Sequence, residues 1–378
     1  MRRPDVASPA TSAPGLPRIR AFDLARGLAV LFMVLVHVLG HYGNDAAWGS
    51  PAGQALIFLG GPTAAPVFMF LMGASLAFSR RSTPRAIAAR GLWLLGLAYT
   101  LNVLRGVLPA SLGLATGYVT EAQIAPYTPA ALMTLVDIHQ MAGLALLVLS
   151  GLTWLAAAAR VPLAVLGLGV AVVVGLVSPL LWGTMSGRPA VDLGLALLWG
   201  ADWNVFFPLF PWLVYPLVGF AYGRLAAARS DPRRFVRRVG VLGVAIGLAG
   251  LALGSVTQPV VTVEDYWRQG PSVLLSILGL VLTWLALADL VADRLGNARA
   301  GRVLYGWSRR VTSMYCIHWI LIGWGVGLVG HRLLDLPAVL AAMLVVLVAT
   351  DRLTVLLPFL RGRRAGATVS AARVRAGA

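Results

Sequence analysis

Long apolar runs alternate with short polar segments along the whole chain. About ten of these runs have the length of roughly 20 residues that a helix needs to cross the hydrocarbon core of a bilayer. They cover residues 22–42, 55–79, 87–107, 132–158, 162–183, 204–225, 239–257, 272–291, 311–329 and 337–358. The pattern predicts an all-α polytopic membrane protein with about ten transmembrane helices, because a helix satisfies its own backbone hydrogen bonds inside lipid.

The composition agrees with a membrane protein. Hydrophobic residues make up 58% of the 378 residues, charged residues make up 12%, and the mean hydropathy is +0.80. A single cysteine excludes an intramolecular disulfide. Residues 1–17 are rich in proline, alanine and serine and are predicted to form a disordered cytoplasmic N-terminus. Residues 18–360 are predicted to form the membrane domain, and residues 361–378 a basic cytoplasmic tail.

The arginines orient the predicted helices. All 31 basic residues are arginine, and with the N-terminus inside the cell 27 of them fall in cytoplasmic segments. The other four are Arg105, Arg188, Arg268 and Arg332. This bias follows the positive-inside rule and predicts that both termini are cytoplasmic. The net charge of +17 is then explained by topology, so no nucleic-acid partner is expected.

Prolines interrupt two of the predicted spans. Residues 60–66 contain two prolines after a pair of glycines, and residues 208–216 contain three prolines. Proline bends a helix and frees backbone carbonyls. Interrupted spans often line cavities in membrane proteins.

Segments predicted to lie outside the membrane combine acidic and aromatic side chains. Residues 184–203 carry Asp192 and Asp202 together with two tryptophans. This combination suits a polar, sugar-like or amine-bearing ligand, and it equally suits an interfacial aromatic belt with solvated acids. We expect Asp202 and the nearby Asn204 to contribute to substrate binding.

The first span carries charge at its start and imidazole in its body. Arg26 and His37 are eleven residues apart, which places them on nearly the same helix face, about 16 Å apart along the axis. Asp23 lies one turn before Arg26. A histidine at this depth is costly unless it faces protein or a water-filled cavity. The alternative is a histidine that only binds a neighbouring helix.

Other polar groups are predicted to approach His37 inside the membrane. His318 lies about 12 Å beyond Arg310 at the inner end of the ninth span, so the two histidines are expected to meet near the midplane. Tyr315 shares a helix face with His318. Asp137, at the start of the fourth span, would orient the ring of His37 if it reached it. The alternative role for this acid is stabilisation of a helix N-terminus.

These residue types suit acyl transfer. A histidine can remove a proton from an amine or hydroxyl, or hold the acyl group itself. The donor would be a cytosolic thioester with a phosphorylated handle, which an arginine such as Arg26 can bind. The sequence contains no G-x-x-x-x-G-K-[ST], H-E-x-x-H or C-x-x-C motif, so nucleotide hydrolysis and zinc chemistry lack support, and no metal is expected.

Several motifs resemble the transmembrane acyltransferase superfamily. Asp23-Leu-Ala-Arg26, followed by Met33-Val-Leu-Val-His37, is similar to the first helix of its acyltransferase-3 branch. Other stretches look closer to the heparan-α-glucosaminide N-acetyltransferase-like branch; they are residues 65–75, 136–140, 207–212, 219–223 and 313–318. Animal members of that branch carry their critical histidine in the loop after the first helix, which leaves His37 and His41 as two candidates.

The resemblance implies that residues 18–360 form an acyltransferase domain in a multi-pass protein of the bacterial plasma (inner) membrane. Its donor would be acyl-CoA, here acetyl-CoA, and its acceptor a carbohydrate or glycolipid outside the cytoplasm; oligomerisation stays open. The predicted catalytic residues are His37 and Asp137, the donor-binding residues are Arg26, Tyr315 and His318, and the acceptor-binding residues are His41, Gln140, Asp202 and Asn204. The main alternative is a transporter or exporter of a small polar or glycosylated substrate, because transporters also carry buried histidines and broken spans. A second alternative is a non-catalytic membrane scaffold or sensor.

Overall fold

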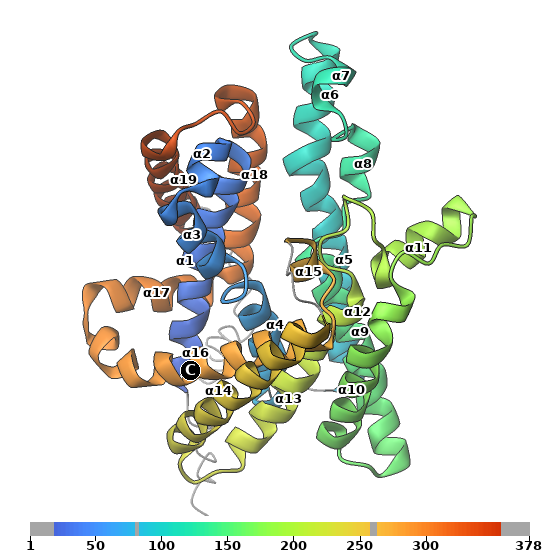
Figure 1. Ribbon diagram of the computed structural model, residues 1–378, viewed down its shortest axis with the longest axis vertical. Coiled ribbons are helices and arrows are strands. Elements are labelled where there is room, and N and C mark those ends of the chain that lie inside the picture. The colour runs from blue at the N-terminus through green and yellow to red at the C-terminus, as the bar shows by residue number, and fades with distance from the viewer. Residues whose placement is uncertain (1–18, 80–82, 258–262, 357–378) are drawn as a thin grey trace, which may run out of the picture.

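A computed structural model describes residues 19–79, 83–257 and 263–356 of the chain (Figure 1). The disordered N-terminus and basic tail predicted from the sequence lie outside the described residues. Regular structure in the described part is helical, with two isolated β-bridges. The helices are α1 (Arg20–Tyr42), α2 (Asp45–Gly49), α3 (Pro51–Gly60), α4 (Ala65–Ala77), α5 (Pro84–Asn102), η1 (Val103–Val107), α6 (Leu108–Ala115), α7 (Glu121–Ile124), α8 (Pro129–Met133), α9 (Ile138–Ala159), α10 (Leu163–Leu181), α11 (Pro189–Trp199), α12 (Leu209–Trp212), α13 (Val214–Ala227), α14 (Pro232–Thr257), α15 (Val263–Trp267), α16 (Pro271–Asn297), α17 (Arg299–Arg309), α18 (Val311–Val329) and α19 (Leu336–Leu356).

The predicted all-α membrane architecture is confirmed. In the described residues, nine helices are long and apolar enough to cross a bilayer. The remaining predicted span, 204–225, is divided into the four-residue α12 and the 14-residue α13. The backbone of Phe210 is extended inside α12, as expected for a residue that precedes a proline. The second span is also interrupted, because a turn separates α3 from α4.

The third span is longer than the sequence predicted. The third span was predicted to end at residue 107. In the structure α5 is followed without a break by the π-helical turn η1 and by α6, so the apolar helix covers Pro84–Ala115. A π-turn lets the chain keep a helical path next to Pro109, which lacks a backbone N–H. Arg105 lies within this turn and is buried. The sequence placed Arg105 at the outer end of the third span, and because the helix continues to Ala115 the residue lies further from that end than predicted.

The interrupted helices α4 and α13 pack backbone against backbone. Three glycines permit the close approach: a Cβ atom at Gly219 would meet the carbonyl oxygen of Phe70, and one at Gly73 would meet that of Pro216. A Cβ atom at Gly223 would lie 2.5 Å from the carbonyl oxygen of Ala74. Small residues at such contacts are typical of membrane helices, where tight packing replaces the hydrophobic effect.

Replacing Gly219 by alanine should lower the melting temperature of the detergent-purified protein. Overpacking of a tight contact costs about 1–3 kcal/mol, and the obstructing atom here belongs to the backbone. Gly169→Ala in α10 is the matched control, because a Cβ atom there meets nothing within 4 Å. Equal melting temperatures for the two variants would contradict the backbone contact.

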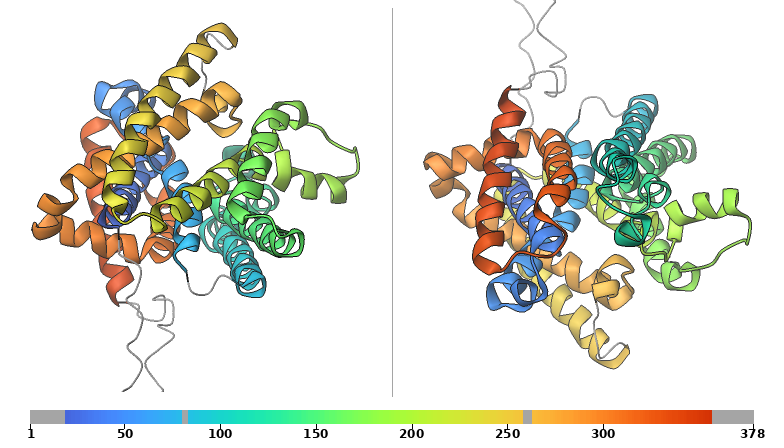
Figure 2. Two further views of the ribbon diagram at one scale, coloured as in Figure 1. Left: turned by 90° about the horizontal axis from the view of Figure 1, so that it is seen from below. Right: turned by 90° about the horizontal axis from the view of Figure 1, so that it is seen from above.

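The helices form two groups that stand side by side above a base (Figure 1). One group contains α1–α3 and α17–α19, the other contains α5, α6 and α8–α11, and the base contains α4, α13, α14 and α16. Within the first group, α1 contacts α3, α17, α18 and α19, and it also contacts α4 and α16 of the base (Figure 2). This central place makes α1 the helix around which the first group packs.

Both ends of the described chain lie on the side of the molecule that carries α17. Arg20, at the start of α1, pairs with Asp293 near the end of α16, at 3.4 Å. Asp351, near the end of α19, accepts hydrogen bonds from Nε1 of Trp307 at 2.8 Å and from Nη2 of Arg310 at 2.9 Å. We refer to this side as the α17 side.

Candidate active site

Two histidine side chains meet inside the helical bundle. Nδ1 of His37, in α1, lies 2.9 Å from Nε2 of His318, in α18. His318 is fully buried, whereas His37 keeps part of its surface accessible. The sequence predicted this contact from the similar depths of the two residues below Arg26 and Arg310, and the structure confirms it.

The hydrogen bonds define where the protons lie on the two neutral rings. Nδ1 of His318 lies 3.0 Å from the backbone carbonyl oxygen of Met314, and a carbonyl only accepts, so this nitrogen carries the proton. Nε2 of His318 is then an acceptor, and Nδ1 of His37 donates to it. The remaining nitrogen, Nε2 of His37, therefore holds a lone pair, as a general base or nucleophile requires.

The indole of Trp319 packs against the His37 ring. The two ring centroids are 4.3 Å apart. The guanidinium carbon of Arg105 lies 4.5 Å from the centroid of the same indole, which is a cation–π contact. No role was predicted from the sequence for Trp319, although it follows His318 directly and shares a helix face with Tyr315 one turn earlier.

A buried ion pair joins Asp137 to Arg105. Oδ2 of Asp137 lies 2.7 Å from Nη1 of Arg105, and the two side chains are 9% and 8% exposed. The sequence predicted Asp137 as a partner of His37, but this carboxylate instead binds Arg105 and accepts a hydrogen bond from the backbone N–H of Ile138 at 2.7 Å. Asp137 therefore caps the N-terminus of α9. Its interaction with His37 is a longer-range charge interaction rather than a hydrogen bond.

Side-chain amides fix the segment that leads into α9. Nδ2 of Asn102 donates to the carbonyl of Leu135 at 2.8 Å, and its Oδ1 accepts from Nη2 of Arg105 at 3.1 Å. Nε2 of Gln140 donates to the same carbonyl at 3.0 Å, and its Oε1 accepts from the backbone N–H of Asp137 at 3.1 Å. Gln140 was predicted to bind the acceptor, but both ends of its amide bind the chain itself and position the ion pair.

Tyr315 lies beside the histidine pair and near the ion pair. Its ring centroid is 5.4 Å from that of His318 and 4.2 Å from that of His139. Its hydroxyl lies within reach of the Asp137 carboxylate and of Nε1 of Trp319, but makes no hydrogen bond of good geometry with any residue that the structure describes. Tyr315 and His318 therefore lie at one site with His37. His139, for which no role was predicted from the sequence, packs against the Tyr315 ring.

Arg26 lies apart from this centre, toward the α17 side. Its guanidinium donates to Oγ of Ser75 at 2.8 Å and to Oγ of Ser308 at 3.4 Å, and it pairs with Asp23 at 3.4 Å. Eleven helical residues separate it from His37, a rise of about 16 Å. A molecule that contacts both residues must therefore extend along α1.

Aromatic and imidazole rings continue from Trp319 away from the α17 side. The ring centroid of His41 lies 5.2 Å from Trp319 and 6.0 Å from His331. Tyr127 lies 5.8 Å from His331 and 5.1 Å from Trp203. Burial and the arginine that follows it lower the pKa of His331, so this ring is neutral at pH 7. His41 therefore lies between the central site and the segment that contains Trp203.

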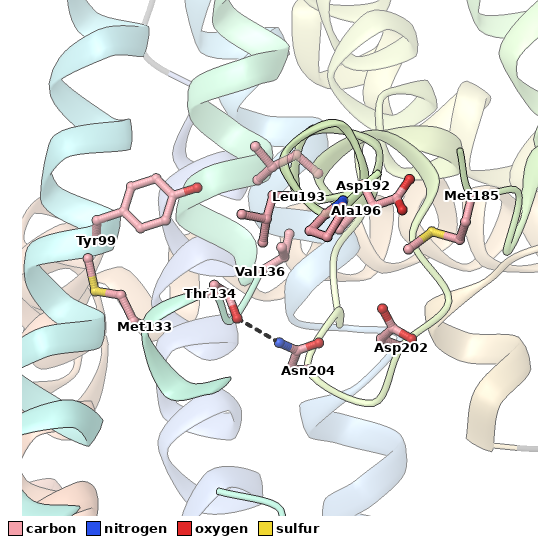
Figure 3. A pocket seen from close by; sticks show the side chains of 12 residues that line it. Tyr99, Met133, Thr134, Val136, Met185, Asp192, Leu193, Ala196, Asp202 and Asn204 are labelled. Carbon is pink, nitrogen blue, oxygen red and sulfur yellow. Dashed lines mark hydrogen bonds between the residues drawn. The ribbon is translucent and has the colours of Figure 1, made fainter. Parts of the chain in front are cut away.

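A pocket of about 330 Å³ lies next to the segment that leads into α9 (Figure 3). Asp202 and Asn204, both predicted to bind substrate, line this pocket together with Asp192. Nδ2 of Asn204 donates to Oγ1 of Thr134 at 3.1 Å. Figure 3 shows the two aspartate carboxylates on the same side of the pocket. Val136 forms part of the wall and directly precedes the ion-paired aspartate, so the pocket lies next to the central site.

The central site combines a lone-pair nitrogen with buried hydrogen-bond donors and a fixed positive charge. A base beside such donors suits removal of a proton from a nucleophile that attacks a carbonyl group. Among the described residues, no group of three or more His, Cys, Asp or Glu side chains is placed to hold a metal ion.

A comparison with protein families gives one match that spans nearly the whole described chain. The family model of acyltransferase-3 proteins, described as an acyltransferase domain, matches residues 19–352. The match runs from the start of α1 into α19 and includes every residue of the candidate site. No curated protein matched the sequence.

Proposed function

The chain belongs to the acyltransferase-3 family and is a multi-pass membrane acyltransferase, and we propose that it transfers an acetyl group from cytosolic acetyl-CoA. The acceptor in this proposal is an amine or hydroxyl of a carbohydrate or glycolipid on the opposite side of the membrane. The observation that carries the proposal is the His37–His318 pair, because its hydrogen bonds leave a lone pair on Nε2 of His37.

In the proposed reaction His37 acts as the general base. Nε2 of His37 takes the proton of the acceptor as its nitrogen or oxygen attacks the thioester carbonyl carbon. The bond between that carbon and sulfur breaks, and the proton returns to the sulfur of CoA, so the products are the acetylated acceptor and free CoA. The alternative route, in which His37 first holds the acetyl group, uses the same lone pair.

We place the donor on the α17 side and propose that this side faces the cytoplasm. Arginine is enriched in the segments that end there, as the positive-inside rule requires. Arg26 lies on this side, and its guanidinium suits a CoA phosphate. An extended CoA arm can follow α1 from Arg26 to His37, which requires a reach of about 16 Å.

We propose that the acceptor binds in the pocket lined by Asp192, Asp202 and Asn204. Carboxylates at its wall favour a cationic amine over a neutral hydroxyl, because opposite charges attract. The resemblance of residues 136–140 and 207–212 to the heparan-α-glucosaminide N-acetyltransferase-like branch supports an amino-sugar acceptor. We also propose a bacterial inner membrane as the location of the protein.

Purified protein in nanodiscs should release free CoA thiol from acetyl-CoA when an acceptor is added. A panel that contains D-glucosamine, D-glucose and amine-bearing lipid-linked sugars tests both acceptor classes, and we expect the amines to react faster. A transporter would instead move the sugar across a proteoliposome membrane without consuming the thioester. Sugar transport with intact acetyl-CoA would therefore contradict the proposed function.

A further inference from the structure

Buried polar groups that lack a well-formed hydrogen bond gather around His37. Nε1 of Trp319, the hydroxyl of Tyr315 and Nδ1 of His139 are all buried and make no hydrogen bond of good geometry in the part of the chain that the structure describes. The Tyr315 hydroxyl lies near Nε1 of Trp319 and near the Asp137 carboxylate, but neither contact is well aligned. Their rings form a continuous series, with centroids 4.2 Å apart from His139 to Tyr315, 6.5 Å from Tyr315 to Trp319 and 4.3 Å from Trp319 to His37. One such group costs about 1–3 kcal/mol, so a cluster of them calls for a functional reason.

The chemistry of these groups indicates an electron-rich ligand atom. The indole N–H of Trp319 can only donate, and the phenol of Tyr315 can donate. The guanidinium of Arg105 lies 4.5 Å from the indole centroid and adds positive charge on that side. Asp137 holds Arg105 in place at 2.7 Å. Donors backed by a cation stabilise an atom on which negative charge develops.

Helix α18 places these donors next to the base. Tyr315 and Trp319 are one turn apart and therefore share a helix face. His318 lies between them in the sequence and binds His37 at 2.9 Å, while Trp319 packs directly on the His37 ring. The base and the two donors therefore lie in one cluster around α18.

We propose that Nε1 of Trp319 and the hydroxyl of Tyr315 form the oxyanion-binding site of the transferase. This inference rests on the proposed function. As the acceptor attacks the thioester, the electron pair of the C=O bond moves onto oxygen, which accepts hydrogen bonds from the two donors. When the electron pair returns, the bond to sulfur breaks and CoA leaves, so the donors stay unchanged. The role predicted from sequence for Tyr315, donor binding, thereby becomes binding of the carbonyl oxygen of the donor.

The infrared stretch of the bound thioester carbonyl tests this site directly. Acetyl-CoA with ¹³C at the carbonyl is bound to the full-length purified protein, without acceptor, and its band is located by difference spectroscopy. Two donors should shift the band to lower wavenumber than in water, and Trp319→Phe and Tyr315→Phe should each remove part of the shift. Trp324→Phe is the matched control on the same helix, because its Nε1 already donates to the carbonyl of Leu104 at 2.9 Å.

Kinetics give the second readout. Loss of one oxyanion donor lowers kcat about 10²–10³-fold, and we expect this loss in each of the Trp319→Phe and Tyr315→Phe variants with little change in the KM for acetyl-CoA. Tyr315→Phe removes a single oxygen atom. Its kcat can therefore test the proposal even if the tryptophan variant does not fold. An unshifted band in the wild type, or full kcat in both variants, would overturn the oxyanion site while leaving the transferase function intact. Failure of the wild type to bind or consume acetyl-CoA would overturn both.

Discussion

Replacing His37 by glutamine is expected to lower the rate of acyl transfer by about 10²–10⁴-fold, the range typical of a lost general base. Glutamine retains a polar group that can reach Nε2 of His318, so the helix contact between α1 and α18 should persist. It supplies no lone pair of comparable basicity where Nε2 of His37 lies. The measurement is release of CoA thiol by the purified variant, with its elution volume in size-exclusion chromatography as the check on folding.

His41 provides the comparison that separates the two candidate histidines. Its ring packs on Trp319 and His331, and it lies one helical turn from His37 on the way to the acceptor side. His41→Gln should therefore raise the KM for the acceptor more than it lowers kcat. A larger loss of kcat in His41→Gln than in His37→Gln would assign the base to the other ring.

The fold and the histidine contact were predictable because they depend on fixed helix geometry. A rise of 1.5 Å per residue and a bilayer of nearly constant thickness set the depth of each residue once the ends of its helix are known. Arginines marked those ends for the first and ninth spans. The observed α18 (Val311–Val329) has the predicted bounds, and His37 and His318 meet as expected.

The partner of Asp137 was not predictable from the same rules. The sequence placed Arg105 at the outer end of a third span that was predicted to end at residue 107. The helix instead continues through the π-turn η1, and this local departure from 3.6-residue periodicity leaves no mark in a hydropathy pattern. The arginine was nevertheless an exception to the positive-inside bias, and a charged residue inside an apolar run is itself a sign of function.

The roles of Trp319 and Gln140 depended on tertiary contacts. A tryptophan in an apolar span is usually explained by packing or by the membrane interface, so only its contact with the His37 ring shows its importance. Gln140 follows Asp137 at the spacing of a capping box, and the structure contains that box. The capping motif was thus visible in the sequence, but the ion pair between Asp137 and Arg105 was not.

Replacing only one partner of the ion pair between Arg105 and Asp137 should strongly destabilise the protein. Removal of one partner from a buried pair costs about 3–5 kcal/mol, because the other charge stays buried without compensation. Arg105→Met and Asp137→Asn should each lower the melting temperature in detergent, measured at one scan rate. Asparagine still caps α9, since it is as good an N-cap as aspartate, so the effect of the second variant reports the lost charge.

The double variant separates stability from catalysis. Arg105→Met with Asp137→Asn leaves no unpaired buried charge, so it should be more stable than either single variant, with a coupling energy measured by the double-mutant cycle. Its kcat should remain low, because the cation that lies 4.5 Å from the Trp319 indole centroid is gone. The exposed pair of Arg332 and Asp45 has the same 2.7 Å separation and serves as the control, where Arg332→Met should change stability little. Equal losses at the two pairs would show that burial does not govern the effect, whereas full activity in the double variant would restrict the ion pair to a structural role.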